Sequence, residues 1–177
     1  MAQTVTTEGQ LRFNVILLGD SGVGKTQLIK VYDDKGFNEQ SRATMGVDYV
    51  TLTKRPKDAQ SDVRVMVWDT AGAERFRSLS QAFYKRAEGA IIGFDLTHRN
   101  SFDNVSNWVS SVRDQCPPGL PLILVGNKCD LEREIDRSEC EALAREINMP
   151  YFETSAKEDI NVNQAFQTII DQVYASQ

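Results

Sequence analysis

Residues 19–26 combine glycines, a lysine and a hydroxyl at a spacing suited to binding phosphate. The segment reads Gly-Asp-Ser-Gly-Val-Gly-Lys-Thr and directly follows the apolar run 13–18. Its glycines let several backbone N–H groups point at one anion, Lys25 adds positive charge for the outer phosphates, and the Thr26 hydroxyl is a ligand for Mg²⁺. The helix expected next aims its positive dipole end at the same anion. A glycine-rich turn that matches by chance is the alternative, and three further motifs favour a nucleotide site instead.

The second motif, Asn127-Lys128-Cys129-Asp130, ends the apolar run 121–126, where a strand is expected. In an open α/β sheet, ligands bind beyond the carboxyl ends of the strands. There the Asp130 carboxylate is suited to accept hydrogen bonds from N1–H and the exocyclic amine of guanine, and the stem of Lys128 is suited to cover the ring. Adenine does not present these two donors together, so the motif favours GTP over ATP. A solvated turn after a strand has a similar composition.

The third motif is Glu-Thr-Ser-Ala-Lys at residues 153–157, after the short apolar run 150–152. Its backbone donors are suited to the guanine oxygen. By itself this segment would be an ordinary loop, and it gains meaning only beside the other motifs.

The fourth motif, Trp-Asp-Thr-Ala-Gly at residues 68–72, ends the alternating segment 63–67. A carboxylate at a strand end holds a water of Mg²⁺, and the N–H of Gly72 is placed to contact a γ-phosphate that GTP has and GDP lacks. Thr44, in the polar segment 37–46, offers a second hydroxyl to the metal. We therefore expect Thr26, Thr44 and, through water, Asp69 to hold Mg²⁺.

In this order the four motifs resemble those of the small GTPases of the Ras superfamily, and most closely those of its Rab branch. The resemblance covers residues 11 to 174, and segments similar to those of Rab proteins occur at 45–49, 75–79 and 83–87. It implies an α/β P-loop G domain, with a six-stranded, mostly parallel sheet flanked by helices on both faces. GTP or GDP and Mg²⁺ are the implied cofactors. The segments around Thr44 and Gly72 become two switch regions, ordered with GTP and loosened with GDP.

The resemblance also implies roles for individual residues. Phe37 packs against guanine, and the catalytic positions are Lys25, Thr44, Gly72 and Ala73. The expected nucleotide-binding residues are Ser21, Gly22, Val23, Gly24, Lys25, Thr26, Gln27, Phe37, Thr44, Gly72, Asn127, Lys128, Asp130, Ser155, Ala156 and Lys157.

Ala73 departs from the family pattern, which usually has a glutamine there to orient the attacking water. Loss of one positioning group predicts hydrolysis slower by about ten to a hundredfold. The resemblance also implies activating proteins that supply an arginine and a glutamine in trans, so assisted hydrolysis can survive the change. The sequence is compatible with Ala73 as the natural residue or as one introduced to hold a single state.

The implied partners are effectors, an exchange factor and an activating protein. By resemblance, Tyr49, Trp68 and Phe83 shape the effector face between the switches, while ordinary core packing explains these aromatic residues equally well.

Composition agrees with a single domain, with residues 1–10 as a flexible lead and 11–177 as the G domain. The chain has 177 residues, 41% of them hydrophobic, and a net charge of −5. The acidic balance and scattered cations argue against nucleic acid as a partner. Three cysteines without metal-ligand spacing indicate reduced thiols and a cytoplasmic setting.

The resemblance implies membrane attachment through a prenylated C-terminal tail, whereas this sequence ends at Ala-Ser-Gln without a terminal cysteine motif. We expect a G domain without its tail, from a protein that cycles onto the cytosolic face of intracellular membranes; a protein that works without a lipid is the alternative.

Apolar spacing predicts three amphipathic helices, at 102–112, 140–147 and 162–173. Asp136 and Glu139 resemble a helix-capping pair. The charged connection 53–62 is either a solvated loop or a partner contact.

The favoured function is a GTP/GDP switch that recruits effectors, by resemblance in vesicle or membrane traffic. The alternative is an interaction module that holds GTP and hardly hydrolyses it, with Ala73 as its only argument. A P-loop kinase is a distant third, because it would not need Asn127, Lys128 and Asp130.

Overall fold

The structure is a computed structural model that describes residues 10–40, 47–70 and 82–177. The expectations for Thr44, Gly72, Ala73 and most of the N-terminal lead lie outside the described residues.

Six strands form one sheet in the order β2-β3-β1-β4-β5-β6. All neighbouring pairs are parallel except β2 with β3, which form an antiparallel hairpin. The expected six-stranded, mostly parallel sheet is confirmed. The strands are β1 (Arg12–Leu18), β2 (Val47–Lys54), β3 (Val63–Thr70), β4 (Gly89–Asp95), β5 (Leu122–Asn127) and β6 (Tyr151–Glu153).

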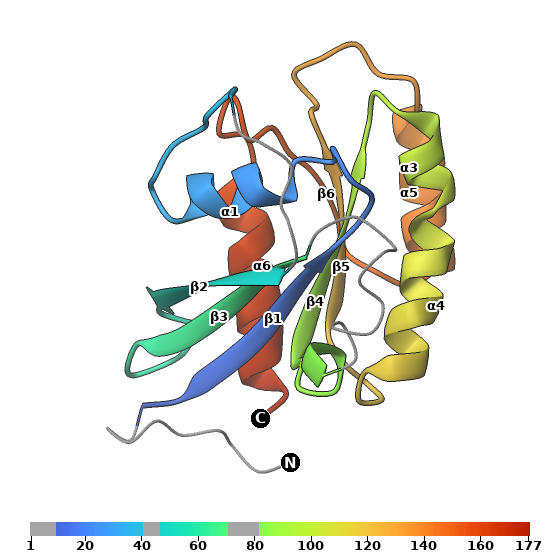
Figure 1. The fold of residues 1–177 in the computed structure, drawn as a ribbon. Helices are drawn as coiled ribbons and strands as arrows, with labels where there is room; N and C mark the ends of the chain where they lie inside the picture. The colour runs from blue at the N-terminus through green and yellow to red at the C-terminus, as the bar shows by residue number, and fades with distance from the viewer. Residues whose placement is uncertain (1–9, 41–46, 71–81) are drawn as a thin grey trace.

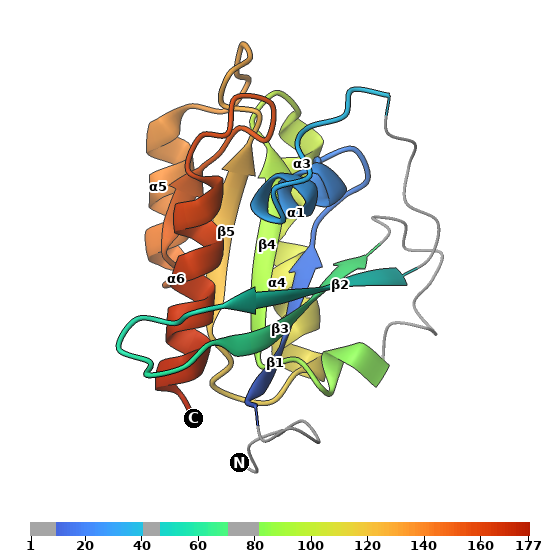
Figure 2. The same cartoon turned by 90° about the vertical axis from the view of Figure 1, so that its left-hand side faces the viewer.

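Helices cover both faces of this sheet, as Figures 1 and 2 show together. One face packs against α1 (Lys25–Tyr32) and α6 (Val162–Ala175), and the other against α3 (Arg99–Asp103), α4 (Val105–Gln115) and α5 (Arg137–Glu146). Every residue of β4 is buried, as expected for a central strand covered on two sides. The fold is a doubly wound α/β sheet, whose ligand sites lie at the carboxyl ends of the strands.

The predicted helices form with two refinements. The first is divided at Asn104 into α3 and α4, and the second begins with the capping box of Asp136 and Glu139. Apolar side chains at the predicted spacing of α6 are buried, because that stripe faces the sheet.

The connection after β2 is docked on α6 rather than being only solvated. The N–H of Lys57 donates to Asp171 at 2.7 Å, and the Gln167 side chain donates to the carbonyl of Arg55 at 3.0 Å. All three cysteines are free, with Cys116 and Cys140 buried. Among the described residues, no helix combines the length and the apolar character needed to cross a membrane.

Candidate functional site

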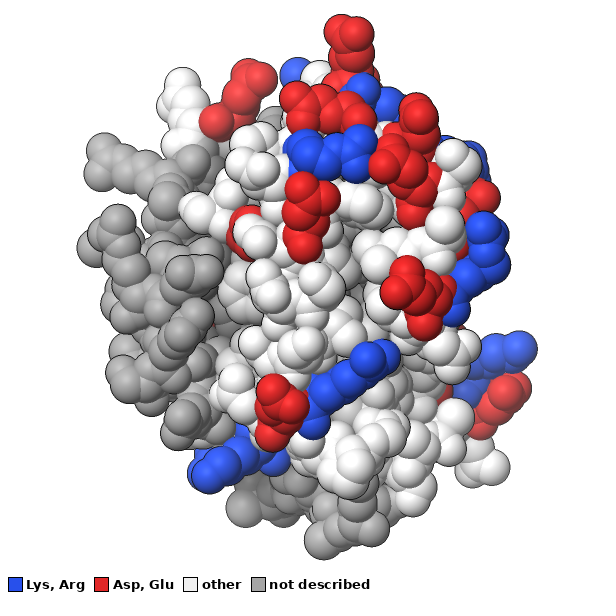
Figure 3. Space-filling model, turned by 90° about the vertical axis from the view of Figure 1, so that its right-hand side faces the viewer, with Lys and Arg blue, Asp and Glu red and all other residues white. Residues whose placement is uncertain are grey.

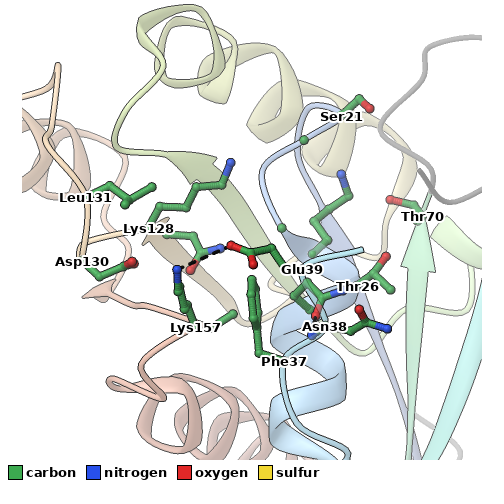
Figure 4. A pocket seen from close by; sticks show the side chains of 16 residues that line it. Ser21, Thr26, Phe37, Asn38, Glu39, Thr70, Lys128, Asp130, Leu131 and Lys157 are labelled. Atoms are coloured by element: carbon green, nitrogen blue, oxygen red, sulfur yellow. Dashed lines mark hydrogen bonds and ion pairs between the residues drawn. The ribbon is translucent and has the colours of Figure 1, made fainter. Parts of the chain in front are cut away.

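A pocket of about 500 Å³ opens at the carboxyl ends of the parallel strands, beside the start of α1. Figure 4 shows its wall, to which the loops after β1, β5 and β6 and the segment after α1 contribute. Its volume lies in the range of small-molecule sites. The described residues that line it are Ser21, Gly22, Gly24, Lys25, Thr26, Gln27, Phe37, Asn38, Glu39, Thr70, Asn127, Lys128, Asp130, Leu131, Ala156 and Lys157.

The loop after β1 requires glycine at two points because the backbone passes close to its neighbours. Gly24 has φ +98°, and a Cβ there would lie 2.5 Å from Nδ2 of Asn127. A Cβ on Gly19 would lie 2.2 Å from the carbonyl oxygen of Gly93. Only glycine permits this conformation and this approach, which bring the loop backbone to the pocket at the start of α1.

Lys25 is a buried cation at the end of the pocket formed by the glycine-rich loop, with only 5% of its surface exposed. Its ammonium donates to the carbonyl oxygens of Gly19 at 2.7 Å and Asp20 at 2.8 Å. Burial lowers the pKa of Lys25 to about 8, although nearby Asp69 and Asp20 act in the opposite direction. A polyanionic ligand in the pocket would relieve the cost of this buried charge.

Thr26 and Asp69 meet beside the pocket, where the hydroxyl donates to Oδ2 of the carboxylate at 2.5 Å. A hydroxyl and a carboxylate are the hard oxygen donors that Mg²⁺ prefers. The donor set therefore fits the expected metal.

Gln27 provides a further donor at the pocket wall. Its Oε1 accepts a hydrogen bond from the N–H of Asn38 at 2.8 Å, while its buried Nε2 has no hydrogen-bond partner among the described residues. Phe37, 39% exposed, lies one residue before Asn38 and also lines the pocket. An unpaired buried donor beside an exposed aromatic ring fits a ligand that has both acceptors and a flat apolar face.

Asn127, which also lines the pocket, ties three loops together. Its Nδ2 donates to the carbonyl of Val23 at 2.9 Å, and its Oδ1 accepts from the Thr154 hydroxyl at 3.0 Å. The backbone N–H of Cys129 donates to the carbonyl of Thr154 at 3.0 Å. Asn127 thus holds the loops after β1, β5 and β6 in a fixed relation.

Asp130 and Lys128 are each held by a partner below the pocket surface. The Ser155 hydroxyl donates to Oδ1 of Asp130 at 2.7 Å, which orients the carboxylate. Lys128 adopts φ +66° and pairs with Oδ2 of Asp95 at 2.6 Å. Positive φ in a residue other than glycine is uncommon and is concentrated at functional sites.

The structure thus brings most of the sequence-predicted nucleotide-binding residues to one pocket. Val23 and Ser155 lie behind the wall, almost fully buried, and support Asn127 and Asp130. Sequence reasoning did not assign Asn38, Glu39, Thr70 or Leu131, although Asn38 and Glu39 directly follow Phe37 in the polar segment it noted. It also missed Asp95. This residue pairs with Lys128 because the parallel register of β4 and β5 places the ends of the two strands side by side, which the sequence does not show.

The comparisons agree with this geometry. The model of the Ras family matches residues 14–175. The chain is 41% identical over 159 residues to Ras-related protein Rab-13 of Rattus norvegicus, covering 89% of this chain and 77% of that protein. It is 38% identical over 176 residues to Ras-related protein Rab11A of Nicotiana tabacum, an alignment that covers 98% of this chain and 81% of that protein. GTP-binding protein ypt3 of Schizosaccharomyces pombe is 38% identical to it over 164 residues, which cover 92% of this chain and 76% of that protein.

The chain belongs to the Ras family. It is therefore a guanine-nucleotide-binding GTPase of the small GTPase class, as the four motifs indicate. The resemblance to Rab proteins stated from the sequence is confirmed by the relatives' names.

A second feature of this Ras-family chain is an aromatic stack at the β2–β3 hairpin. Trp68 lies between Tyr49, at a centroid distance of 5.0 Å, and Phe83, at 6.2 Å. Tyr49 is 51% exposed, whereas Phe83 is buried at 7%. The stack therefore runs from the core to the surface.

Proposed function

We propose that this chain is a Rab-like switch that alternates between GTP and GDP in this pocket and, in the GTP state, recruits effectors in vesicle or membrane traffic. One observation carries the proposal: a buried lysine in a glycine-rich loop and an oriented carboxylate suited to guanine line opposite parts of one pocket. Its proposed membrane attachment is a prenylated tail.

In this proposal each end of the pocket has a separate task. Lys25 and the N–H groups of the loop bind the phosphates, and Asp130 accepts the N1–H and amine hydrogen bonds of guanine. Mg²⁺, when bound, neutralises charge developing on the phosphates during transfer. Thr26 and Thr44 would hold the metal, and Asp69 would hold one of its waters.

Ala73 makes intrinsic hydrolysis slow, because alanine has no polar group to orient the attacking water. We expect the Ala73→Gln variant to hydrolyse bound GTP about ten to a hundred times faster in a single turnover. Ala73→Ser, whose hydroxyl is too short to replace the amide, serves as the control. Equal rates for Ala73 and Ala73→Gln would contradict this role.

The alternative, an interaction module that holds GTP, is favoured by the same residue. The deciding experiment identifies the nucleotide released from freshly purified protein and follows GTP-loaded protein over hours, with and without a Rab-type activating protein. Conversion to GDP supports the switch. GTP that persists with the activator supports the module, and bound adenine nucleotide contradicts the guanine assignment.

The aromatic stack supports an effector face on the β2–β3 hairpin. Trp68→Ala removes the central ring between Tyr49 and Phe83, so it should weaken effector binding far more than nucleotide retention. Effector affinity and GDP dissociation are measured on the same preparation. Comparable losses in both would make Trp68 a core residue.

A further inference from the structure

Asp20 places a negative charge in the loop proposed to bind phosphate. It directly precedes Ser21 and Gly22, which line the pocket, but Asp20 itself does not line it. A carboxylate free to turn toward bound phosphates would repel them. The loop therefore needs a way to keep this charge away from its ligand.

Both carboxylate oxygens of Asp20 are held by side chains from the helical layer. Nδ2 of Asn104 donates to Oδ2 at 2.7 Å, and Nε1 of Trp108 donates to Oδ1 at 2.8 Å. These donors are neutral, so they fix the direction of the carboxylate without cancelling its charge.

The two donors are close neighbours at the start of α4. Asn104 is the junction of α3 and α4, and Trp108 lies four residues later, on the same face of the helix. The N–H of Trp108 also donates to the carbonyl of Asn104 at 3.2 Å. Figure 1 shows the loop after β1 reaching toward this pair of helices.

On the face that they form, charged side chains gather toward the upper end in Figure 3, and uncharged ones cover much of the middle.

We propose that Asn104 and Trp108 are positioning residues for the nucleotide, which hold the Asp20 carboxylate against α4 and so keep its charge off the phosphates. The inference rests on the proposed function of the pocket. The carbonyl of Asp20 also accepts a hydrogen bond from Lys25. Fixing Asp20 therefore helps to hold in place both the Asp20 carboxylate, which would repel phosphate, and the Lys25 ammonium, which would attract it.

The test compares two substitutions in α4, made in the full chain loaded with a fluorescent GDP and Mg²⁺. Trp108→Phe keeps a ring in place but removes the N–H, so GDP should dissociate roughly three to ten times faster. Ser111→Ala is the control, because it removes from the same helix a hydroxyl that donates to the carbonyl of Asn107 at 3.0 Å instead of to the loop. Its dissociation rate should match that of the unaltered protein.

A second background separates charge from packing. Asp20→Asn keeps an acceptor oxygen but removes the charge, so Trp108→Phe should accelerate dissociation much less in that background. An equal acceleration in both backgrounds, or none in either, overturns the inference, and Tm values identify a variant that has merely lost stability. Failure of the unaltered protein to bind GDP would instead refute the proposed function.

Discussion

The two ends of the pocket are organised in different ways. The end proposed to bind the base (the base end), residues 127–130 and 154–157, is cross-linked by hydrogen bonds between loops, such as those joining Asn127 to Thr154 and Ser155 to Asp130. At the phosphate end, residues 19–26, the ammonium of Lys25 donates to carbonyls of its own loop. The base end is thus preformed, whereas the phosphate end holds a charge that must change partners when a polyanion binds.

The largest expected effect comes from the base end. Asp130→Asn replaces one of the two acceptor oxygens by a donor, so GDP affinity should fall roughly 10²–10³-fold while affinity for xanthosine diphosphate rises. Titration with both nucleotides measures the change. Asp159→Asn, the same substitution in a neighbouring exposed loop, is the control. Unchanged guanine preference in Asp130→Asn would refute the assignment of the base end.

The next effect tests the phosphate end. Lys25→Met should lower GDP affinity roughly 10- to 100-fold, because a charge-assisted contact to phosphate is lost. The nucleotide-free protein should be as stable as the unaltered one or more so, since a charge whose pKa burial lowers to about 8 is removed. Calorimetry and thermal unfolding measure the two quantities, with Lys30→Met on the same helix as control. A large stability loss without an affinity loss would make Lys25 structural.

The smallest effect concerns the pH dependence of stability at the end of β6, directly before the base end. Burial alone would raise the pKa of Glu153. The hydrogen bonds and charge of Arg133, whose shorter contact is 2.6 Å, act together with Tyr151 and Arg137 to outweigh burial and lower that pKa. A carboxylate with a lowered folded pKa stabilises the fold above its unfolded pKa and loses this contribution as pH falls through the folded value.

Between neutral and acidic pH, the Tm of the unaltered chain should therefore fall further than the Tm of Glu153→Gln. Thermal unfolding across this range measures the difference. Glu146→Gln, in the last turn of α5, is the control. Parallel pH profiles for Glu153→Gln and the unaltered chain would show that the Arg133 contact contributes nothing.

Local patterns in the sequence account for much of the fold. The spacing at 162–173 predicted α6, and Asp136 with Glu139 predicted a capping box, because both depend on neighbours within a few residues. The interruption at Asn104 was not predicted. At this interruption the side chain of Asn104 donates a hydrogen bond to Asp20, which lies 84 positions away in the sequence, so no local pattern could have indicated it.

The sequence by itself determined which chemical groups this protein offers: a glycine-rich loop with a lysine, a carboxylate in the Asn-Lys-Cys-Asp motif, and an alanine where a water-positioning glutamine is usual in the family. These follow from residue type and short spacing, which decide the available donors, acceptors and charges. The tertiary structure alone decided what holds those groups, because the parallel register pairs Lys128 with Asp95 and the packing of α4 fixes Asp20. Such contacts depend on which distant strands and helices become neighbours, and no local pattern records that.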